Sequence, residues 1–296
     1  MNNLSVLSEE YLTECSIRNF SVETIKNKKI VANELIRTVG DLELDKVTKA
    51  TVKKFIVAVS ERKKASTINT CLRNLKGWFK FLVEEEYIVS NPFDKVEALK
   101  EEKTIIRTYS IDVVGQILEK FWAKDFNTER NKLIVITLVE TGIRVSELCD
   151  IKMEDVLDNS IKIHGKGNKI RFVPLTEALA GQLVGYLKQR TIHLGEVECD
   201  NLFVSKFRKA LTRTGVNQLM TDSVFKGIAD TDGVAITVHN FRRFFAQNML
   251  DNVDVYTVSR LMGHSKITTT ERYLRGTENA KILERGMNSP LKNMFK

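Results

Sequence analysis

Apolar side chains in the first hundred residues recur every three or four positions, which is the spacing of one face of an α-helix. One such stripe follows a possible cap at Ser21 and stops near Gly40, where glycine favours a helix end. Two further stripes begin after Thr48 and Ser66. The pattern breaks at Pro92, because a proline ring disfavours helix in the residue before it. This part of the chain is therefore predicted to be wholly helical.

A charged segment without a periodic apolar face follows at residues 100–108. We interpret it as a linker between a helical N-terminal domain, residues 1–99, and a second domain, residues 109–296. Ser110 fits the cap of the first helix in the second domain. A length of 296 residues also agrees with two domains better than with one.

The second domain mixes the periods of helix and strand. Alternating apolar and polar residues at 161–164 and 170–173 flank a glycine-rich turn, which predicts a β-hairpin. Helical spacing predicts helices at 110–122, 129–140, 144–150, 204–213 and 217–229, with helical patterns also from about Glu177 and toward the C-terminus. The predicted fold class is mainly α, with an α+β second domain that carries a small antiparallel sheet.

Composition limits the classes of function that the chain can have, but it does not identify one. Hydrophobic residues make up 43% and charged residues 28%, which is ordinary for a globular protein. The formal net charge of +8 suits binding to nucleic acid or to an anionic membrane, but also solubility alone. The longest strongly apolar run, Leu133–Val139, is far too short to span a bilayer. Four scattered cysteines lack zinc-ligand spacing and no targeting segment is visible, so we expect reduced thiols in a cytoplasmic protein.

Arg144 is the first candidate for binding an anion. It follows Gly142, which can end one helix and turn the chain, and Glu147 lies one helical turn further on. A guanidinium offers a planar fork of donors that fits two phosphate oxygens. The same spacing also fits a plain surface ion pair between Arg144 and Glu147, and this motif alone does not decide between the two.

His239 and Arg242 also lie one helical turn apart, behind a possible cap at Thr237. They should therefore project to one side near a helix N-terminus, where backbone N–H groups favour an anion. Arg243 should point elsewhere, toward DNA backbone or solvent. For His239 the alternative is a histidine whose hydrogen bonds are satisfied within the core.

Tyr273 is the candidate nucleophile. A helix over Val255–Met262 should end at Gly263, whose left-handed conformation would place His264 outside the helix. Thr268 begins a capping-box pattern for a further helix, which carries Tyr273. A tyrosine hydroxyl is a poor nucleophile near neutral pH and needs a base or nearby cations. Its spacing from His264 is what singles this tyrosine out.

Lys166 lies in the turn of the predicted hairpin, between two glycines. Such a turn can carry an ammonium group into a groove. Lys169 and Arg171 follow in the next strand and are candidates for contact with DNA. A solvated hairpin tip is the simpler alternative.

Together these segments resemble the tyrosine site-specific recombinases, the family of phage integrases and Xer-type recombinases. The segments TGIRVSEL, GKGNK, VPL, HNFRR and LMGH, followed by Tyr273, stand in the family's order and cover the second domain. The N-terminal domain resembles the family's SAM-like, core-binding DNA-binding domain in its helical pattern only.

The resemblance implies a role for each candidate. Tyr273 would attack the scissile phosphate of DNA and form a 3′-phosphotyrosine with a free 5′-hydroxyl. Arg144 and Arg242 would bind the non-bridging oxygens, where the transition state holds negative charge. Lys166 would protonate the leaving 5′ oxygen as general acid.

The remaining candidates support this chemistry. His239 would assist proton movement at Tyr273, and His264 would donate to the phosphate. Glu147 matches an acidic position of the family and would support the site. Because these cations supply the positive charge that metal ions supply in other enzymes, the resemblance implies no metal and no cofactor.

The implied partner is double-stranded DNA with inverted half-sites. The working unit would be a homo-oligomer, a tetramer on two DNA sites, which exchanges strands through a Holliday junction. The C-terminal tail, about residues 276–296, would dock on a neighbouring protomer. Accessory proteins or a sister recombinase are further candidate partners, no membrane is expected, and the protein would act at the nucleoid in the cytoplasm. Integration, excision and resolution of DNA all remain open as its role.

Two other functions compete with recombination. A type IB topoisomerase uses similar chemistry to relax DNA, and a DNA-binding accessory protein could keep the fold without the activity. The spacing of Gly263 and His264 and the compact helical N-terminal domain favour a recombinase. The complete set of candidate residues argues against an inactive accessory protein.

Overall fold

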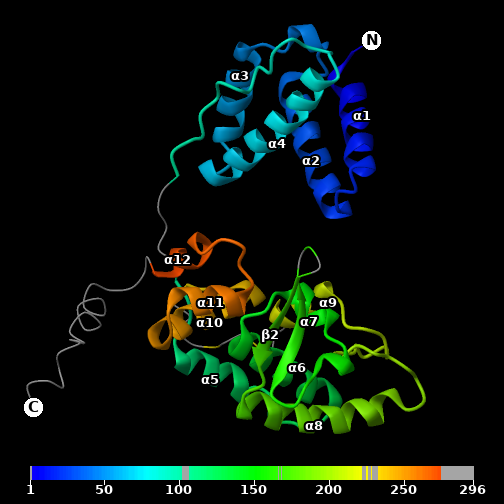
Figure 1. Cartoon of the computed structure of the whole chain (residues 1–296), viewed down its shortest axis with the longest axis vertical. Coiled ribbons are helices and arrows are strands. Elements are labelled where there is room, and N and C mark those ends of the chain that lie inside the picture. Colours follow the sequence, from blue (N-terminus) through cyan, green and yellow to red (C-terminus); the bar gives the residue numbers. More distant parts are fainter. Residues whose placement is uncertain are drawn as a thin grey trace, which may run out of the picture. The chain divides into compact units, whose positions relative to one another are not determined.

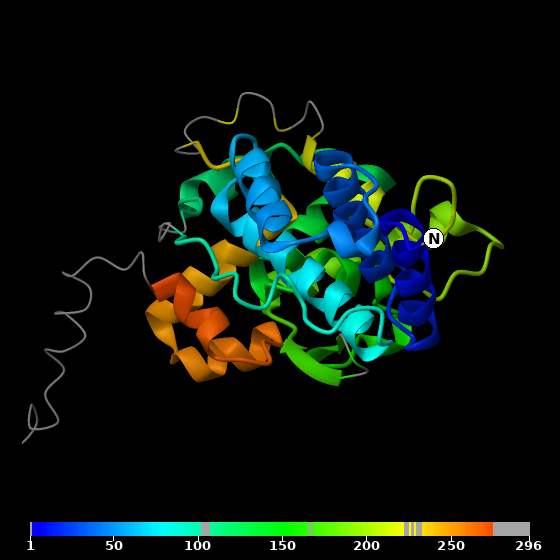
Figure 2. The ribbon, with the colours of Figure 1, turned by 90° about the horizontal axis from the view of Figure 1, so that it is seen from above.

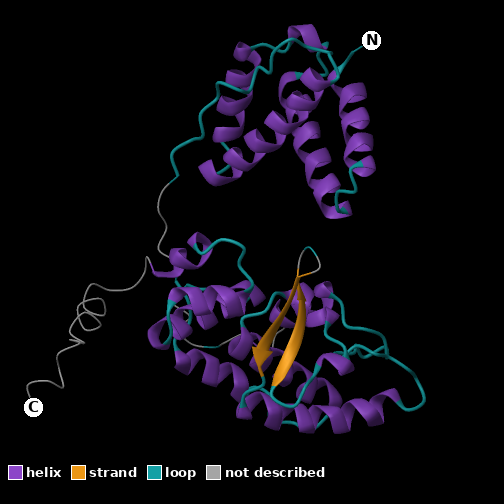
Figure 3. Cartoon of the chain, in the orientation of Figure 1, coloured by secondary structure: helices purple, strands orange, loops and turns teal. Residues whose placement is uncertain are grey.

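The computed structural model describes residues 2–101, 107–165, 167, 169–221, 225, 228 and 233–274. The chain divides into two compact units, Met1–Lys103 and Thr104–Lys296. Figure 3 shows that both units are mainly helical and that the second carries a pair of strands. None of the helices in the described ranges is long and apolar enough to cross a membrane.

The first unit confirms the helical prediction (Figure 1). Its elements are α1 (Leu4–Ile17), α2 (Val22–Val39), the short 3₁₀ helix η1 (Leu44–Lys46), α3 (Lys49–Ser60) and α4 (Ala65–Glu84). Ser21 caps α2 as expected, since its hydroxyl accepts a hydrogen bond from the backbone N–H of Thr24. Helix α4 begins slightly before Ser66, and its buried face, which includes Trp78 and Phe79, forms the centre of this unit's core.

The second unit combines helices with a two-stranded sheet. Its elements are α5 (Ile111–Glu119), α6 (Phe126–Thr141), α7 (Val145–Asp150), η2 (Met153–Asp155), β1 (Ser160–Gly165), β2 (Lys169–Pro174), α8 (Glu177–Leu194), α9 (Arg213–Thr221), α10 (Val238–Asn252), α11 (Val255–Met262) and α12 (Thr268–Leu274). The strands pair antiparallel, with Gly165 opposite Lys169, so the predicted hairpin is confirmed. Ser110 caps α5 as expected.

Helix α6 lies at the centre of the second unit and packs against α8 and α10. Its buried residues Leu133, Ile134 and Leu138 belong to the large core of this unit. A smaller apolar cluster, which includes Phe245 and Tyr273, joins α10, α11 and α12. These three helices lie side by side in both views (Figures 1 and 2). The packing of this cluster fixes the helix that carries Tyr273.

Some sequence expectations do not match the structure. The segment 204–213 is not a helix but an irregular loop, closed by a bridge between Val204 and Ala210. Residues 206–210 are all exposed, so this segment has no buried face that packing could stabilise as a helix. Helix α9, at Arg213–Thr221, begins four residues before the helix predicted at 217–229, and the described residue Ile228 is not helical.

One helix boundary also differs, and some expectations cannot be placed. Helix α12 includes Thr268 as its first residue instead of beginning after it. Lys166, most of the expected linker and the tail from residue 275 onward lie outside the described residues.

Candidate active site

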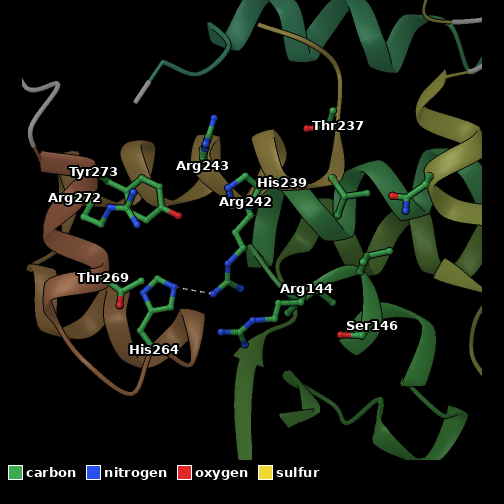
Figure 4. A pocket seen from close by; sticks show the side chains of 14 residues that line it. Arg144, Ser146, Thr237, His239, Arg242, Arg243, His264, Thr269, Arg272 and Tyr273 are labelled. Carbon is green, nitrogen blue, oxygen red and sulfur yellow. Dashed lines mark hydrogen bonds between the residues drawn. The ribbon is translucent and has the colours of Figure 1, made fainter. Parts of the chain in front are cut away.

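Five of the candidates line a single pocket of about 580 Å³. They are Arg144 at the start of α7, His239 and Arg242 on α10, His264 after α11, and Tyr273 on α12. Figure 4 shows these side chains turned toward one another from their separate elements. The fold therefore brings together residues that are far apart in the sequence.

Two glycines make the turns that aim Arg144 and His264. Gly142 ends α6 with φ 58° and Gly263 ends α11 with φ 65°, both in the left-handed region that favours glycine. These two predicted helix ends are confirmed. A Cβ atom added at Gly142 would stand 2.3 Å from Cδ1 of Phe245, so the glycine also allows α6 to approach α10 closely.

Arg242 is a buried cation with neutral partners. It is 5% exposed, and it donates to the carbonyl oxygens of Gly142 (2.5 Å) and Met262 (2.8 Å) and to Nε2 of His264 (2.9 Å). Burial and the charge of Arg144 lower the pKa of Arg242 to about 10, so the guanidinium stays charged at neutral pH. Its other two N–H groups have no partner in the part of the chain that the structure describes, and they can bind an anion.

The hydrogen bonds of His264 fix its tautomer. A guanidinium can only donate, so Nε2 accepts from Arg242, while Nδ1 carries the proton and donates to Oγ1 of Thr270 at 2.7 Å. Burial, together with the charges of Arg242 and Arg144, lowers the pKa of His264 to about 4. The imidazole is therefore neutral at neutral pH, and Nε2 presents a lone pair instead of a proton.

Glu147 is a buried carboxylate shared by two arginines. It is 4% exposed and accepts hydrogen bonds of 2.7–3.0 Å from the backbone N–H and Nη1 of Arg144 and from Nη1 and Nη2 of Arg171. Burial alone would raise its pKa, but the bonds from Arg171 and Arg144 outweigh burial and lower the pKa of Glu147 to about 2. This is not the plain surface ion pair considered from the sequence.

Arg171 does not lie where a contact with DNA was expected. Its side chain is 13% exposed and bonds to Glu147 and to the carbonyl oxygen of Leu261. Successive side chains of a strand point to opposite faces. In β2 the neighbouring apolar residues Ile170 and Phe172 face outward, at 52% and 55% exposed, and Arg171 faces inward.

His239 and Arg243 both line the pocket. Burial and the charges of Arg243 and Arg242 lower the pKa of His239, which favours its uncharged form at neutral pH. Arg243 was expected to point elsewhere, yet it lines the pocket and donates to Oδ1 of Asn240 at 2.9 Å.

Sequence reasoning missed several residues of this site. The pocket is also lined by Arg272, Ser146, Thr269 and Asn217. Thr270 does not line the pocket, but it orients His264 through a hydrogen bond. Only Arg272, beside Tyr273, carried a signal in the sequence, namely its charge. Among the candidates for contact with DNA, Lys169 is exposed at the start of β2. Within the described ranges, no group of His, Cys, Asp and Glu side chains could hold a metal ion.

The chain is similar to known families and proteins. Residues 110–280 match the model of the phage integrase family. Tyrosine recombinase XerC of Anoxybacillus flavithermus is 30% identical over 247 residues, which cover 80% of each chain. A tyrosine recombinase of Agathobacter rectalis is 28% identical over 287 residues and 92% of each chain. The chain therefore belongs to the phage integrase family, and its enzymatic class is that of the tyrosine recombinases.

Solved structures agree with this fold. A lambda integrase tetramer bound to a Holliday junction has a TM-score of 0.76 at 20% identity, covering 93% of this chain and 79% of that chain. The Tn1549 transposon integrase in complex with a circular intermediate DNA has a TM-score of 0.75 at 18% identity, covering 96% and 99%. At these identities the likeness concerns the fold.

Proposed function

We propose that this tyrosine recombinase cuts and rejoins double-stranded DNA at a specific site, with Tyr273 as the nucleophile. The observation that carries the proposal is the position of Tyr273 in one pocket with Arg144 and Arg242 of the same chain. Attack by the tyrosine oxygen on the phosphorus would form a 3′-phosphotyrosine and break the bond to the 5′ oxygen, which leaves as a hydroxyl after taking up a proton. Attack by a 5′-hydroxyl on the phosphotyrosine reverses the step, releases Tyr273 and reseals the strand, so the number of phosphoester bonds stays constant.

The cations of the pocket support the phosphate-binding part of this reaction. Arg144 and Arg242 would hold the non-bridging oxygens, and loss of one such donor costs about 10²–10³-fold in rate. His239, uncharged at neutral pH, can accept the hydroxyl proton of Tyr273. Lys166 would deliver the proton to the leaving 5′ oxygen.

His264 has a conditional role in this proposal. Its Nε2 accepts a hydrogen bond from Arg242 when DNA is absent, so it can donate to a phosphate only after Nε2 gains a proton. The negative charge of a bound phosphate favours that protonation. Binding of the scissile phosphate would thus be coupled to protonation of Nε2, either by uptake of a proton or by a change of tautomer in which Nδ1 accepts a hydrogen bond from the Thr270 hydroxyl.

Relatives support an assembly on DNA. Lambda integrase was solved as a dimer on a core site, and XerH on a palindromic difH substrate after cleavage. We accordingly propose inverted half-sites, a tetramer on two DNA sites and a Holliday-junction intermediate for this chain. Residues 1–99 would bind the core DNA, 100–108 would link the domains and the tail, about 276–296, would dock on a neighbouring protomer. The protein would act at the nucleoid in the cytoplasm, alone or with accessory proteins or a sister recombinase.

A nicked suicide duplex tests the chemistry directly. The nick lets a short fragment beside the scissile phosphate dissociate, so the covalent complex with the full chain accumulates and survives denaturing electrophoresis. DNA that flanks the gene supplies the first substrates. Tyr273→Phe should bind the same DNA but form no adduct, and an adduct in that variant would remove Tyr273 from the proposed role.

The products separate the competing functions. Recombinant products and four-way junctions from two sites support a recombinase. Relaxation of supercoils without strand exchange would support a topoisomerase, and binding without any adduct would support an accessory protein.

A further inference from the structure

Arg171 joins three segments of the second unit. From β2, its Nη1 and Nη2 donate to the two carboxylate oxygens of Glu147 on α7 at 3.0 and 2.8 Å. Its Nε donates to the carbonyl oxygen of Leu261, in the last turn of α11, at 2.8 Å. One planar group therefore sets the separation of α7 from the end of α11.

Both of the segments that Arg171 holds carry groups of the pocket. Glu147 binds the backbone N–H and the guanidinium of Arg144, and Leu261 lies just before the turn that places His264. The guanidinium of Arg171 also packs against that turn, because a Cβ atom on Gly263 would stand 2.9 Å from its Nη1. Arg171 itself is not among the residues that line the pocket.

We propose that Arg171 is a positioning residue, which fixes Arg144 through Glu147 and His264 through the end of α11 so that both bind one phosphate. A lysine at this position could pair with Glu147, but its single nitrogen cannot reproduce the fork that spans two carboxylate oxygens and a carbonyl. The inference rests on the proposed binding of the scissile phosphate by Arg144 and His264.

A change of substrate separates positioning from general loss of structure. A methylphosphonate at the scissile position replaces one non-bridging oxygen with a methyl group and removes the negative charge. Cleavage of this neutral substrate depends less on cations that bind the oxygens. The single-turnover rate of adduct formation is therefore measured on nicked duplexes with either linkage, together with the affinity of the full chain for DNA.

The expected result is a selective loss. Arg171→Gln and Arg171→Lys should slow cleavage of the phosphate by about 10²-fold, the order of loss that a 1 Å misplacement can cause. The loss of rate on the methylphosphonate should be smaller by a factor of at least about ten. The affinity of each variant for DNA should stay within about twofold of the wild-type value. Because Arg171→Gln leaves the Glu147 charge buried with one partner fewer, the double variant Arg171→Gln/Glu147→Gln is included. It lacks both charges and should show the same selectivity.

Arg190 provides the matched control. This buried arginine of α8 donates to the backbone carbonyls of Leu202, Cys199 and Asn201, away from the pocket. Arg190→Gln should lower the stability of the fold and change the rates on the two substrates by the same factor.

Several outcomes would overturn the inference. Equal losses on both substrates for the Arg171 variants, as for Arg190→Gln, would make Arg171 a structural residue only, and wild-type rates would show that its contacts are dispensable. Adduct formation by wild type and its absence in Tyr273→Phe are established first. A wild type that forms no adduct would overturn the proposed function, and this inference with it.

Discussion

Glu147→Gln should destabilise the second unit by about 3 kcal/mol at neutral pH. The carboxylate accepts four hydrogen bonds from Arg144 and Arg171, whereas an amide has one oxygen and would turn its NH₂ group toward two of those donors. A pKa of about 2, against an ordinary value of 4.5, corresponds to roughly 3 kcal/mol, since a tenfold change in proton affinity is worth about 1.4 kcal/mol. The cost of removing one partner from a buried ion pair, about 3–5 kcal/mol, agrees with this figure.

The same pKa sets the pH dependence of the effect. Because the folded-state pKa of Glu147 lies below the unfolded-state value, its contribution to stability is complete above about pH 4.5 and is lost as the pH falls toward 2. Glutamine does not titrate. The difference in unfolding free energy between wild type and Glu147→Gln should therefore shrink from about 3 kcal/mol near pH 7 to about 2 kcal/mol near pH 3.5.

Urea unfolding of the full chain measures this difference in unfolding free energy. Hydrogen–deuterium exchange in peptides of α6 and α8 follows the unfolding, because these peptides report on the second unit alone. Glu154→Gln is the control, because the side chain of Glu154 is 78% exposed and its loss should change stability by less than about 0.5 kcal/mol. A Glu147→Gln variant as stable as this control, or a difference that grows as the pH falls, would refute the reasoning.

Further predictions concern His264, Gly142 and Lys166. His264 should titrate with a pKa of about 4 in the DNA-free protein, which NMR of its ring can follow, with His264→Asn to assign the signal. Because this folded-state pKa lies below the ordinary 6.5, the histidine should make stability rise with pH between about 4 and 6.5. A pKa above 6.5 would contradict the tautomer. Gly142→Ala should cost roughly 2–5 kcal/mol of unfolding free energy in urea, from about 1–2 for the left-handed backbone and about 1–3 for the clash with Phe245. A loss below about 1 kcal/mol would contradict the close approach of α6 to α10. Lys166→Ala should cleave a normal substrate slowly but a 5′-thiol substrate at nearly the wild-type rate, because a thiolate leaves without a proton; an equally slow reaction would indicate positioning instead of acid catalysis.

Local signals in the sequence predicted much of the scaffold around the pocket. The helix over Val255–Met262 and its end at Gly263 were predictable because caps and left-handed glycines act within a few residues. Ser21 and Ser110 were predictable for the same reason. The order of the family's motifs in the sequence then identified candidate residues, five of which the fold brings into one pocket.

Contacts between distant segments were not predictable in this way. Alternation in β2 shows that Ile170 and Phe172 share a face, but not that this face is the exposed one and that Arg171 turns inward. The pairing of Thr270 with His264 depends on how α12 packs, which no short pattern records. The position of Lys166 stays a prediction.

The guanidinium of Arg242 binds the backbone carbonyls at the ends of two helices, Gly142 after α6 and Met262 in α11. Such carbonyls lack partners within their own helix and carry partial negative charge. A descendant of this chain that gave up DNA cleavage could replace Tyr273 with phenylalanine and keep its packing against α10 and α11, but replacing Arg242 would leave two buried helix ends without a donor. Retention of this arginine in a related sequence is therefore weak evidence of activity, while loss of the tyrosine is strong evidence against it.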